Sequence, residues 1–246
     1  MRQAEDEDQM LTPRTKEKLK KGLADQATLL KDFGILFTNS VYLTTMIGAA
    51  TMFFTVSGLQ FWSITYMQVI MDIDPLNSQM SFIITLLSAV LPGTIIGSLI
   101  SDRFGGYKGP AMSSALNLLI IFGIGQLISA QAILLTRDLT VFLILVWFVG
   151  FFVGSIMPIA SGLLIGCVPK MTRNSGLALY GIVQNIFGLS FAPVAAGMIM
   201  EDYRDKKEGM LAGYGMLLTS PIAIIFFFVV ARVIVAVHKR DVRRET

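Results

Sequence analysis

The stretch Gly97-Ser-Leu-Ile-Ser-Asp-Arg-Phe-Gly-Gly-Tyr-Lys108 is a short charged turn between two long apolar segments. It is the only place among the apolar segments where an acid, bases and paired glycines lie together. We expect Gly105 and Gly106 to adopt positive φ angles, because a turn this tight needs a backbone conformation that glycine adopts readily. Asp102, at the end of one predicted helix, and Lys108, near the start of the next, must be solvated or paired, since unsatisfied polar groups are costly inside a membrane.

The composition indicates a protein that crosses a membrane several times. Of the 246 residues, 54% are hydrophobic and 15% are charged, and the charges are confined to the ends and to short interruptions. Six segments of more than twenty residues contain no Asp, Glu, Lys or Arg. The core of a water-soluble protein would not have such segments, so we predict an all-α membrane protein with six transmembrane helices.

The predicted organisation has three parts. Residues 1–38 form a cytoplasmic tail whose basic amphipathic segment, Thr15 to Asp32, is either an interfacial helix on an anionic membrane surface or a solvated linker helix. Residues 39–237 form the transmembrane bundle, and residues 238–246 form a basic cytoplasmic tail. The six predicted spans are 39–71, 79–101, 110–135, 139–168, 175–200 and 209–237.

One face of the first predicted span carries a stripe of small and polar residues. At 100° per residue its members fall within about 80° of one another. The stripe either lines a polar cavity or lets a neighbouring helix pack closely. Small residues favour packing, whereas the size of two members, Trp62 and Tyr66, favours a cavity. The stripe consists of Thr44, Gly48, Thr51, Thr55, Gly58, Trp62 and Tyr66.

Small residues at a spacing of four predict close helix contacts in two later spans. The second span has Gly93, Gly97 and Ser101 at this spacing. The fourth has two glycine pairs around a proline, which predicts a bendable helix in tight contact with a neighbour. These residues are Gly150, Gly154, Pro158, Gly162 and Gly166.

The distribution of basic residues predicts the orientation. Sixteen Lys and Arg residues lie on the side of the two termini and only four on the other, which places both termini in the cytoplasm. Arg232 is counted with the basic tail in this total, and we expect no charged residue or histidine to lie inside any span. Such spans provide no proton relay and no fixed charge for a charged head group, so a small apolar or amphipathic solute fits better.

The charged turn resembles the signature loop of the major facilitator superfamily of transporters, Gly-x-Leu-Ala-Asp-Arg-x-Gly-Arg-Arg/Lys. It departs from that pattern at Ser98, in place of the first glycine, and at Gly106, in place of the first basic residue. In this superfamily the loop follows the second helix of each six-helix half, which is its position here. The resemblance implies that the six spans form the C-terminal half, built as a 3+3 inverted repeat, and act by alternating access.

A weaker similarity concerns the spinster-type lipid transporters. It is carried by Gly58-Leu-Gln-Phe-Trp62 with Tyr66, and by Pro169-x-x-x-Arg173-x-x-Gly176-x-Ala178 followed by Gly188 and Ala192-Pro193.

The superfamily resemblance implies two groups of functional residues. A gating loop would couple the halves, with Asp102 facing a positive helix end of the other half in one state, although charges that only set topology are the alternative. A substrate cavity would be lined by the first and fourth spans, helped by the second and fifth, although each cavity candidate could instead have an ordinary packing role. The gating residues are Ser98, Asp102, Arg103, Gly105, Gly106, Lys108 and Arg173. The cavity candidates are Gln60, Trp62, Tyr66, Trp147, Ser155, Tyr180, Gln184 and Asn185.

Six spans cannot enclose a central site alone, so transport requires a second six-helix half. That half is a separate chain, a region outside this sequence or a second copy. The alternative function is a non-transporting structural subunit of a larger membrane complex. The expected partners are therefore the lipid bilayer and a second half or other membrane subunits, and not nucleic acid, because the basic residues follow one side of the membrane.

We expect no enzymatic activity, cofactor or metal site. No span pairs a nucleophile with a base at helical spacing, and no cluster has the spacing of metal ligands. The only histidine, His238, lies in the basic tail. The only cysteine, Cys167, lies in an apolar segment and is expected to be a packing residue rather than a reactive thiol.

Overall fold

The computed structural model describes residues 31–107 and 109–245, with side chains described as far as Lys239 except that of Pro110. Most of the expected amphipathic segment, and Lys108 of the charged turn, therefore lie outside the described residues. The described part of the chain is helical and contains no strand. Six of its helical segments are long and apolar enough to cross a membrane, which confirms the prediction of a multi-pass helical protein at that level.

Residues 31–38 are helical and lead into the first span, α3 (Ser40–Ile70). The second, third and fourth spans are α4 (Pro75–Arg103), α5 (Met112–Leu135) and α6 (Leu139–Gly166). The fifth span consists of α7 (Arg173–Val183), a π-helical segment (Gln184–Ser190) and α8 (Phe191–Glu201). The sixth consists of α9 (Lys206–Thr219) and α10 (Pro221–Glu245).

Polar side chains define where several of these helices begin. Asn39, Asp74, Asp138 and Asp205 cap α3, α4, α6 and α9 by accepting a hydrogen bond from a backbone N–H of the first turn. Helix α4 begins at Pro75, four residues earlier than expected, because Asp74 caps it and proline fits the first helical position. Hydrogen bonds from the backbone and side chain of Asn77 lower the pKa of Asp74.

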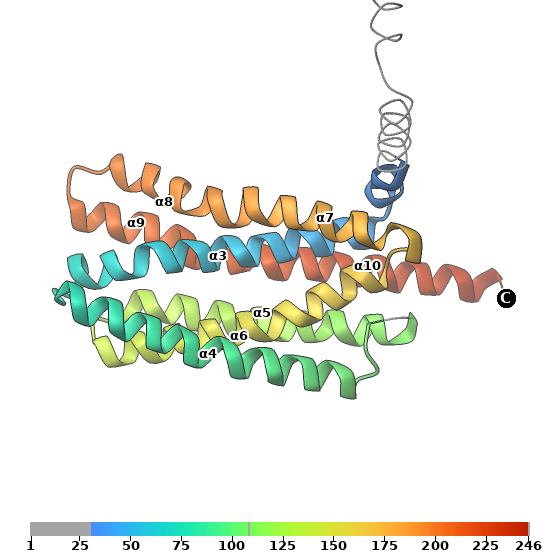
Figure 1. Cartoon of the computed structure of the whole chain (residues 1–246), viewed down its shortest axis with the longest axis horizontal. Coiled ribbons are helices and arrows are strands. Elements are labelled where there is room, and N and C mark those ends of the chain that lie inside the picture. The colour runs from blue at the N-terminus through green and yellow to red at the C-terminus, as the bar shows by residue number, and fades with distance from the viewer. Residues whose placement is uncertain (1–30, 108, 246) are drawn as a thin grey trace, which may run out of the picture.

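The six spans lie side by side, and α3 is the most buried of them (Figure 1). Helix α3 packs against α9, α10, the π-helical segment and α6. Helix α4 packs along α6, while α5 packs against both α6 and α10. The first described helical turns and the C-terminus lie at the same end of the bundle (Figure 1). We call this the basic end, because Arg103, Lys170, Arg173 and Lys239 also belong to it.

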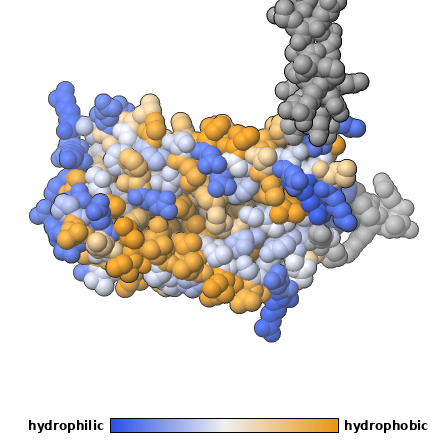
Figure 2. Space-filling model, in the orientation of Figure 1, coloured by the Kyte–Doolittle hydropathy of each residue, from blue (hydrophilic) through white to orange (hydrophobic). Residues whose placement is uncertain are grey.

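The distribution of polarity over the surface fits a membrane-spanning bundle. On the face shown in Figure 2, hydrophilic residues gather mainly at the two ends, and apolar and intermediate residues cover most of the length between them. Many of the exposed side chains are large and apolar, for example Leu87, Leu91 and Phe226. Such a surface is stable in lipid and would be an aggregation hazard in water.

Two spans are interrupted in ways that the sequence analysis did not anticipate. The sixth span breaks at Ser220, directly before Pro221. The fifth contains a π-helical segment directly before α8, in which Pro193 is the third residue. Since proline has no N–H, the carbonyl of Leu189 lacks its usual helical donor, and it accepts a hydrogen bond from the Ser57 hydroxyl at 2.6 Å instead.

One expectation is wrong. No charged residue was expected inside a span, but Arg232 lies within the predicted span 209–237, and α10 continues through it to Glu245. Its Nε donates a hydrogen bond to Asn117 Oδ1 of α5 at 2.9 Å. A long arginine side chain near the end of a span can reach the interface, which makes this position tolerable.

Candidate functional site

The turn after α4 is built as its glycines predicted. Gly105, Gly106 and Gly109 have φ angles of +94°, +80° and +56°, in the region that other residues rarely adopt. The N–H of Gly105 donates to the carbonyl of Asp102 at 3.2 Å, and the N–H of Gly106 donates to that of Ser101 at 3.1 Å. These bonds end α4 and reverse the chain within a few residues.

Tyr107 attaches this turn to the end of α6. A Cβ atom added at Gly162 would lie 2.6 Å from the ring of Tyr107, and one at Gly166 would lie 2.7 Å from its carbonyl oxygen. Gly162 and Gly166, the second glycine pair of the fourth span, therefore leave the space that Tyr107 fills. The spacing of these glycines predicted a close neighbour, but not that the neighbour is Tyr107.

The charged residues of the turn project into solvent. Asp102 and Arg103 are exposed, and within the described residues neither forms an ion pair. Ser98, one turn earlier, is half-buried and donates a hydrogen bond to the carbonyl of Thr94. Arg173, at the start of α7, is half-buried, and its Nε has no hydrogen-bond partner within the described part. Asp102 and Arg103 are therefore available to a surface outside this bundle.

The small and polar stripe of the first span is a packing surface in this structure. A Cβ atom added at Gly48 would lie 2.8 Å from the ring of Phe228 in α10, and one at Gly58 would lie 2.3 Å from Leu217 in α9. The hydroxyl of Thr55 is hydrogen-bonded to that of Ser220, at the break in the sixth span. Gly48, Thr55 and Gly58 of the stripe thus pack against α9, α10 and the break between them, which is the packing alternative of the two.

The seam between α3 and the fifth span is held by polar contacts around Pro193. Besides the bond from Ser57 to Leu189, the indole Nε1 of Trp62 donates to the carbonyl of Pro193 at 3.0 Å. A Cβ atom added at Gly188 would lie 3.0 Å from the carbonyl oxygen of Ala50. The irregular π-helical backbone is therefore fixed against α3. Short π-helical segments inside α-helices are frequently found at functional sites.

The structure separates the eight cavity candidates into two groups. Tyr66 and Ser155 are fully buried, Tyr180 is nearly so, and Trp62 is committed to Pro193. Ser155 donates to the carbonyls of Gly93 and Phe151, and Tyr66 stacks between Tyr214 and Phe142. The second group consists of Gln60 and Asn185, which are exposed, and Gln184 and Trp147, which are half-buried. Apart from the half-buried Trp62, whose indole N–H is bonded to Pro193, the second group alone among these candidates offers surface to a solute or partner.

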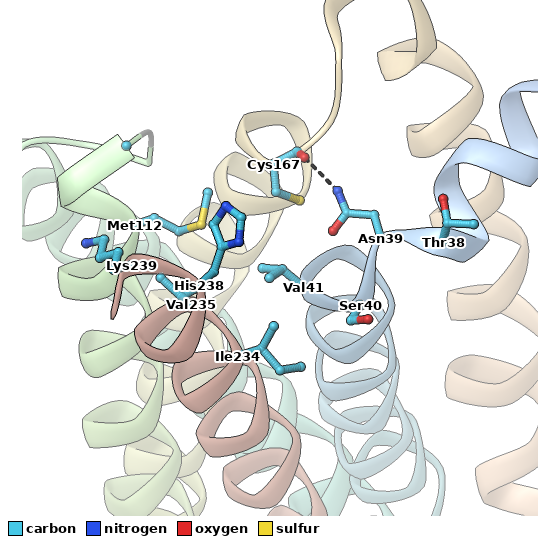
Figure 3. Close-up of a pocket in the computed structure, with 11 residues that line it drawn as sticks. Thr38, Asn39, Ser40, Val41, Met112, Cys167, Ile234, Val235, His238 and Lys239 are labelled. Atoms are coloured by element: carbon cyan, nitrogen blue, oxygen red, sulfur yellow. Dashed lines mark hydrogen bonds between the residues drawn. The ribbon is translucent and has the colours of Figure 1, made fainter. Parts of the chain in front are cut away.

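A cavity of about 750 Å³ opens at the basic end, between the start of α3 and the end of α10 (Figure 3). Asn39 organises one wall, because its Oδ1 accepts from the N–H of Tyr42 and its Nδ2 donates to the carbonyl of Cys167 at 2.8 Å. Lys239 Nζ donates to Ser113 Oγ at 2.8 Å on the opposite side. The cavity is lined by Thr38, Asn39, Ser40, Val41, Gly109, Met112, Cys167, Ile234, Val235, His238 and Lys239.

The N-terminal segment is joined to the fifth span at this same end. Ser175 Oγ donates to Asp32 Oδ2 at 2.6 Å, and the hydroxyl of Tyr42 donates to the carbonyl of Gly176 at 2.6 Å. Leu36, between them, is fully buried. These contacts were missed by the sequence analysis, and only the capping preference of an asparagine before an apolar run could have pointed to Asn39.

Comparison with known proteins adds no identification. No protein-family model matches the chain, and curated proteins give no significant match. The resemblance to the major facilitator superfamily therefore depends on sequence motifs alone and stays a prediction. Within the described residues there is also no group of three or more His, Cys, Asp or Glu side chains that could hold a metal ion.

Proposed function

We propose that this chain is one six-helix half of a membrane transporter that works by alternating access, with both termini in the cytoplasm. A second six-helix bundle would dock against the face that includes α4 and the fifth span. These two spans are the least buried of the six, with 17% of their most apolar windows buried in each case. The solute would be small, and apolar or amphipathic.

The pattern of helix pairing is the observation that carries this proposal. Helix α4 packs on α6, and the fifth span packs on α3. In the same way, α5 packs on α6, and the sixth span packs on α3. Exchanging the first three spans for the last three therefore leaves these pairings unchanged, although α8 packs against α9 more closely than α4 packs against α5. Because successive spans alternate in direction, α3 and α6 run oppositely, so the exchange also inverts the unit. That is the arrangement an inverted repeat would have.

A second candidate is supported by a different observation. The stripe on α3 is occupied by α9 and α10, and most aromatic cavity candidates are used in packing. A bundle with so little polar surface near its middle would also suit a structural subunit of a larger membrane complex. In that case the exposed faces of α4 and the fifth span would hold other helices without moving.

A cysteine-labelling experiment separates the two candidates. Asn185 is exposed and lies twelve residues after the start of α7, about 18 Å along the helix and so near mid-membrane. An Asn185→Cys variant in a Cys167→Ser background is treated with a membrane-impermeant maleimide from either side of oriented vesicles. Alternating access predicts labelling from both sides, whereas a static subunit predicts labelling from one side or from neither.

The chain provides a matched control for this experiment. Phe187, two residues further on, is 60% exposed but lines an apolar groove with Phe54 and Phe191. Phe187→Cys should stay unlabelled from both sides, because a thiol facing lipid does not ionise. Native mass measurement of the particle provides a separate test. A functional particle containing one copy of this 27.0 kDa chain and no other membrane subunit would overturn both candidates.

A further inference from the structure

We propose that the cavity at the basic end binds the phosphate head group of one anionic phospholipid. The inference requires that the bundle lie in a membrane with this end at the interface, but it does not depend on whether the chain transports a solute. The site is also distinct from the face proposed to receive a second bundle, because its walls come from the start of α3 and the end of α10.

The polar part of the cavity suits an anion. Lys239 and His238 contribute cationic or hydrogen-bonding groups from α10, and Ser40 contributes a hydroxyl from α3. The bond from Lys239 Nζ to Ser113 Oγ fixes the ammonium group beside the cavity, and the imidazole of His238 points toward Met112 and Cys167 (Figure 3). Among the described residues, no acidic side chain lines the cavity. A phosphate would meet hydrogen-bond donors and positive charge there.

The remaining walls are apolar, which favours a lipid over a soluble anion. Val41, Met112 and Val235 line the cavity beside its polar groups. A second, open groove of about 310 Å³ shares Ile234 and His238 with the cavity and continues along Val233 and Val237 of α10. Both of these valines are about half exposed on the outside of the bundle. An acyl chain can lie in this groove while its head group stays at the polar rim.

The location agrees with the chemistry of the membrane surface. The cavity lies at the end that the proposed orientation places in the cytoplasm, and the cytoplasmic leaflet carries the anionic lipids. Basic pockets between transmembrane helices on that side are suited to anionic head groups. In sequence, Lys239 is followed by Arg240, Arg243 and Arg244 together with Asp241 and Glu245, so this segment adds a small excess of positive charge at the same end.

Native mass spectrometry of the full chain tests the proposal. The protein is extracted into mixed micelles that contain equal amounts of phosphatidylserine and phosphatidylcholine, and retained lipid is counted at increasing collision energy. We expect one phosphatidylserine to be retained in preference to phosphatidylcholine. Lys239→Gln, which keeps a donor for Ser113, and His238→Glu, at an exposed side chain, should each reduce retention about fivefold to tenfold.

Two controls make the outcome decisive. Lys207→Gln, an exposed lysine at the opposite end of the bundle, should retain phosphatidylserine like the unaltered chain. Inorganic phosphate at millimolar concentration should not displace the lipid, and displacement would show a site for a free anion instead. Equal retention of the two lipids by the unaltered chain would overturn the proposal without reference to any variant. Unchanged retention in both Lys239→Gln and His238→Glu, with helicity intact by circular dichroism, would overturn it as well.

Discussion

The contact between α4 and α6 gives the most direct test of this packing. A Cβ atom added at Gly93 would lie 2.2 Å from the carbonyl oxygen of Phe151, and one at Gly97 would lie 2.4 Å from that of Ser155. An ordinary carbon–oxygen contact is about 3.3 Å, so either Gly→Ala change must separate the two backbones by about 1 Å. No flexible side chain can move aside, because the atoms approached belong to the backbone.

We expect Gly93→Ala and Gly97→Ala each to destabilise the bundle by about 1–3 kcal/mol, the usual cost of overpacking. Gly93→Ala also weakens the bond from the Ser155 hydroxyl to the Gly93 carbonyl, adding about 0.6 kcal/mol. Once one alanine has separated the helices, the second meets less resistance. The double variant should therefore cost less than the sum of the two single changes.

The assay is reversible unfolding in mixed micelles with increasing dodecyl sulfate, followed by circular dichroism. Gly181→Ala is the matched control, because it lies in the fifth span and nothing is within 4 Å of its added Cβ atom. We expect this control to be as stable as the unaltered chain or more stable by up to about 1 kcal/mol, because alanine favours a helix interior over glycine. The reasoning is refuted if Gly93→Ala and Gly97→Ala both stay within about 0.5 kcal/mol of the control, the range of an ordinary surface substitution.

Three further predictions concern the basic end. Asn39→Ala should lower the thermal midpoint more than Asn39→Ser, because serine keeps a helix cap, worth about 1 kcal/mol, and loses only the donor to Cys167; equal midpoints in detergent would contradict a role for the cap. Burial raises the pKa of Cys167 from 9.0 to about 12, so its thiolate fraction at pH 8 should be about a thousandfold below that of an unperturbed thiol. Alkylation of Cys167 by iodoacetamide should accordingly be far slower than that of a cysteine placed at exposed Lys207, and its rate should still rise above pH 10; a plateau near pH 9 would show an unperturbed thiol. Asp102→Asn should impair transport or assembly while insertion and stability stay normal, since the carboxylate is exposed and unpaired within the described residues; unchanged behaviour in co-purification and transport assays would leave the turn as a topology signal only.

The sequence alone determined the class of the fold and the features that depend on local chemistry. Long uncharged segments predict membrane helices, because the bilayer excludes charge and requires every backbone group to be bonded within its own segment. The positive φ angles of Gly105 and Gly106 were also predictable, since a tight turn after a helix requires them locally. The small residues of α4 and α6 indicated close contacts, because only glycine lets helix backbones approach so nearly.

The tertiary structure alone decided which partner each of these features meets. A stripe such as that on α3 has the same periodicity whether it lines a cavity or receives a helix, and only the position of α9 and α10 shows that it is used for packing. The π-helical segment and its bonds to Ser57 and Trp62 could not be predicted, because they join residues about 130 positions apart. The hydrogen-bond partner of Arg232 is likewise a distant residue, Asn117 of α5. Hydrophobicity and turn chemistry act over a few residues and can be read along the chain, whereas the choice of neighbour depends on complementary surfaces that meet only after folding.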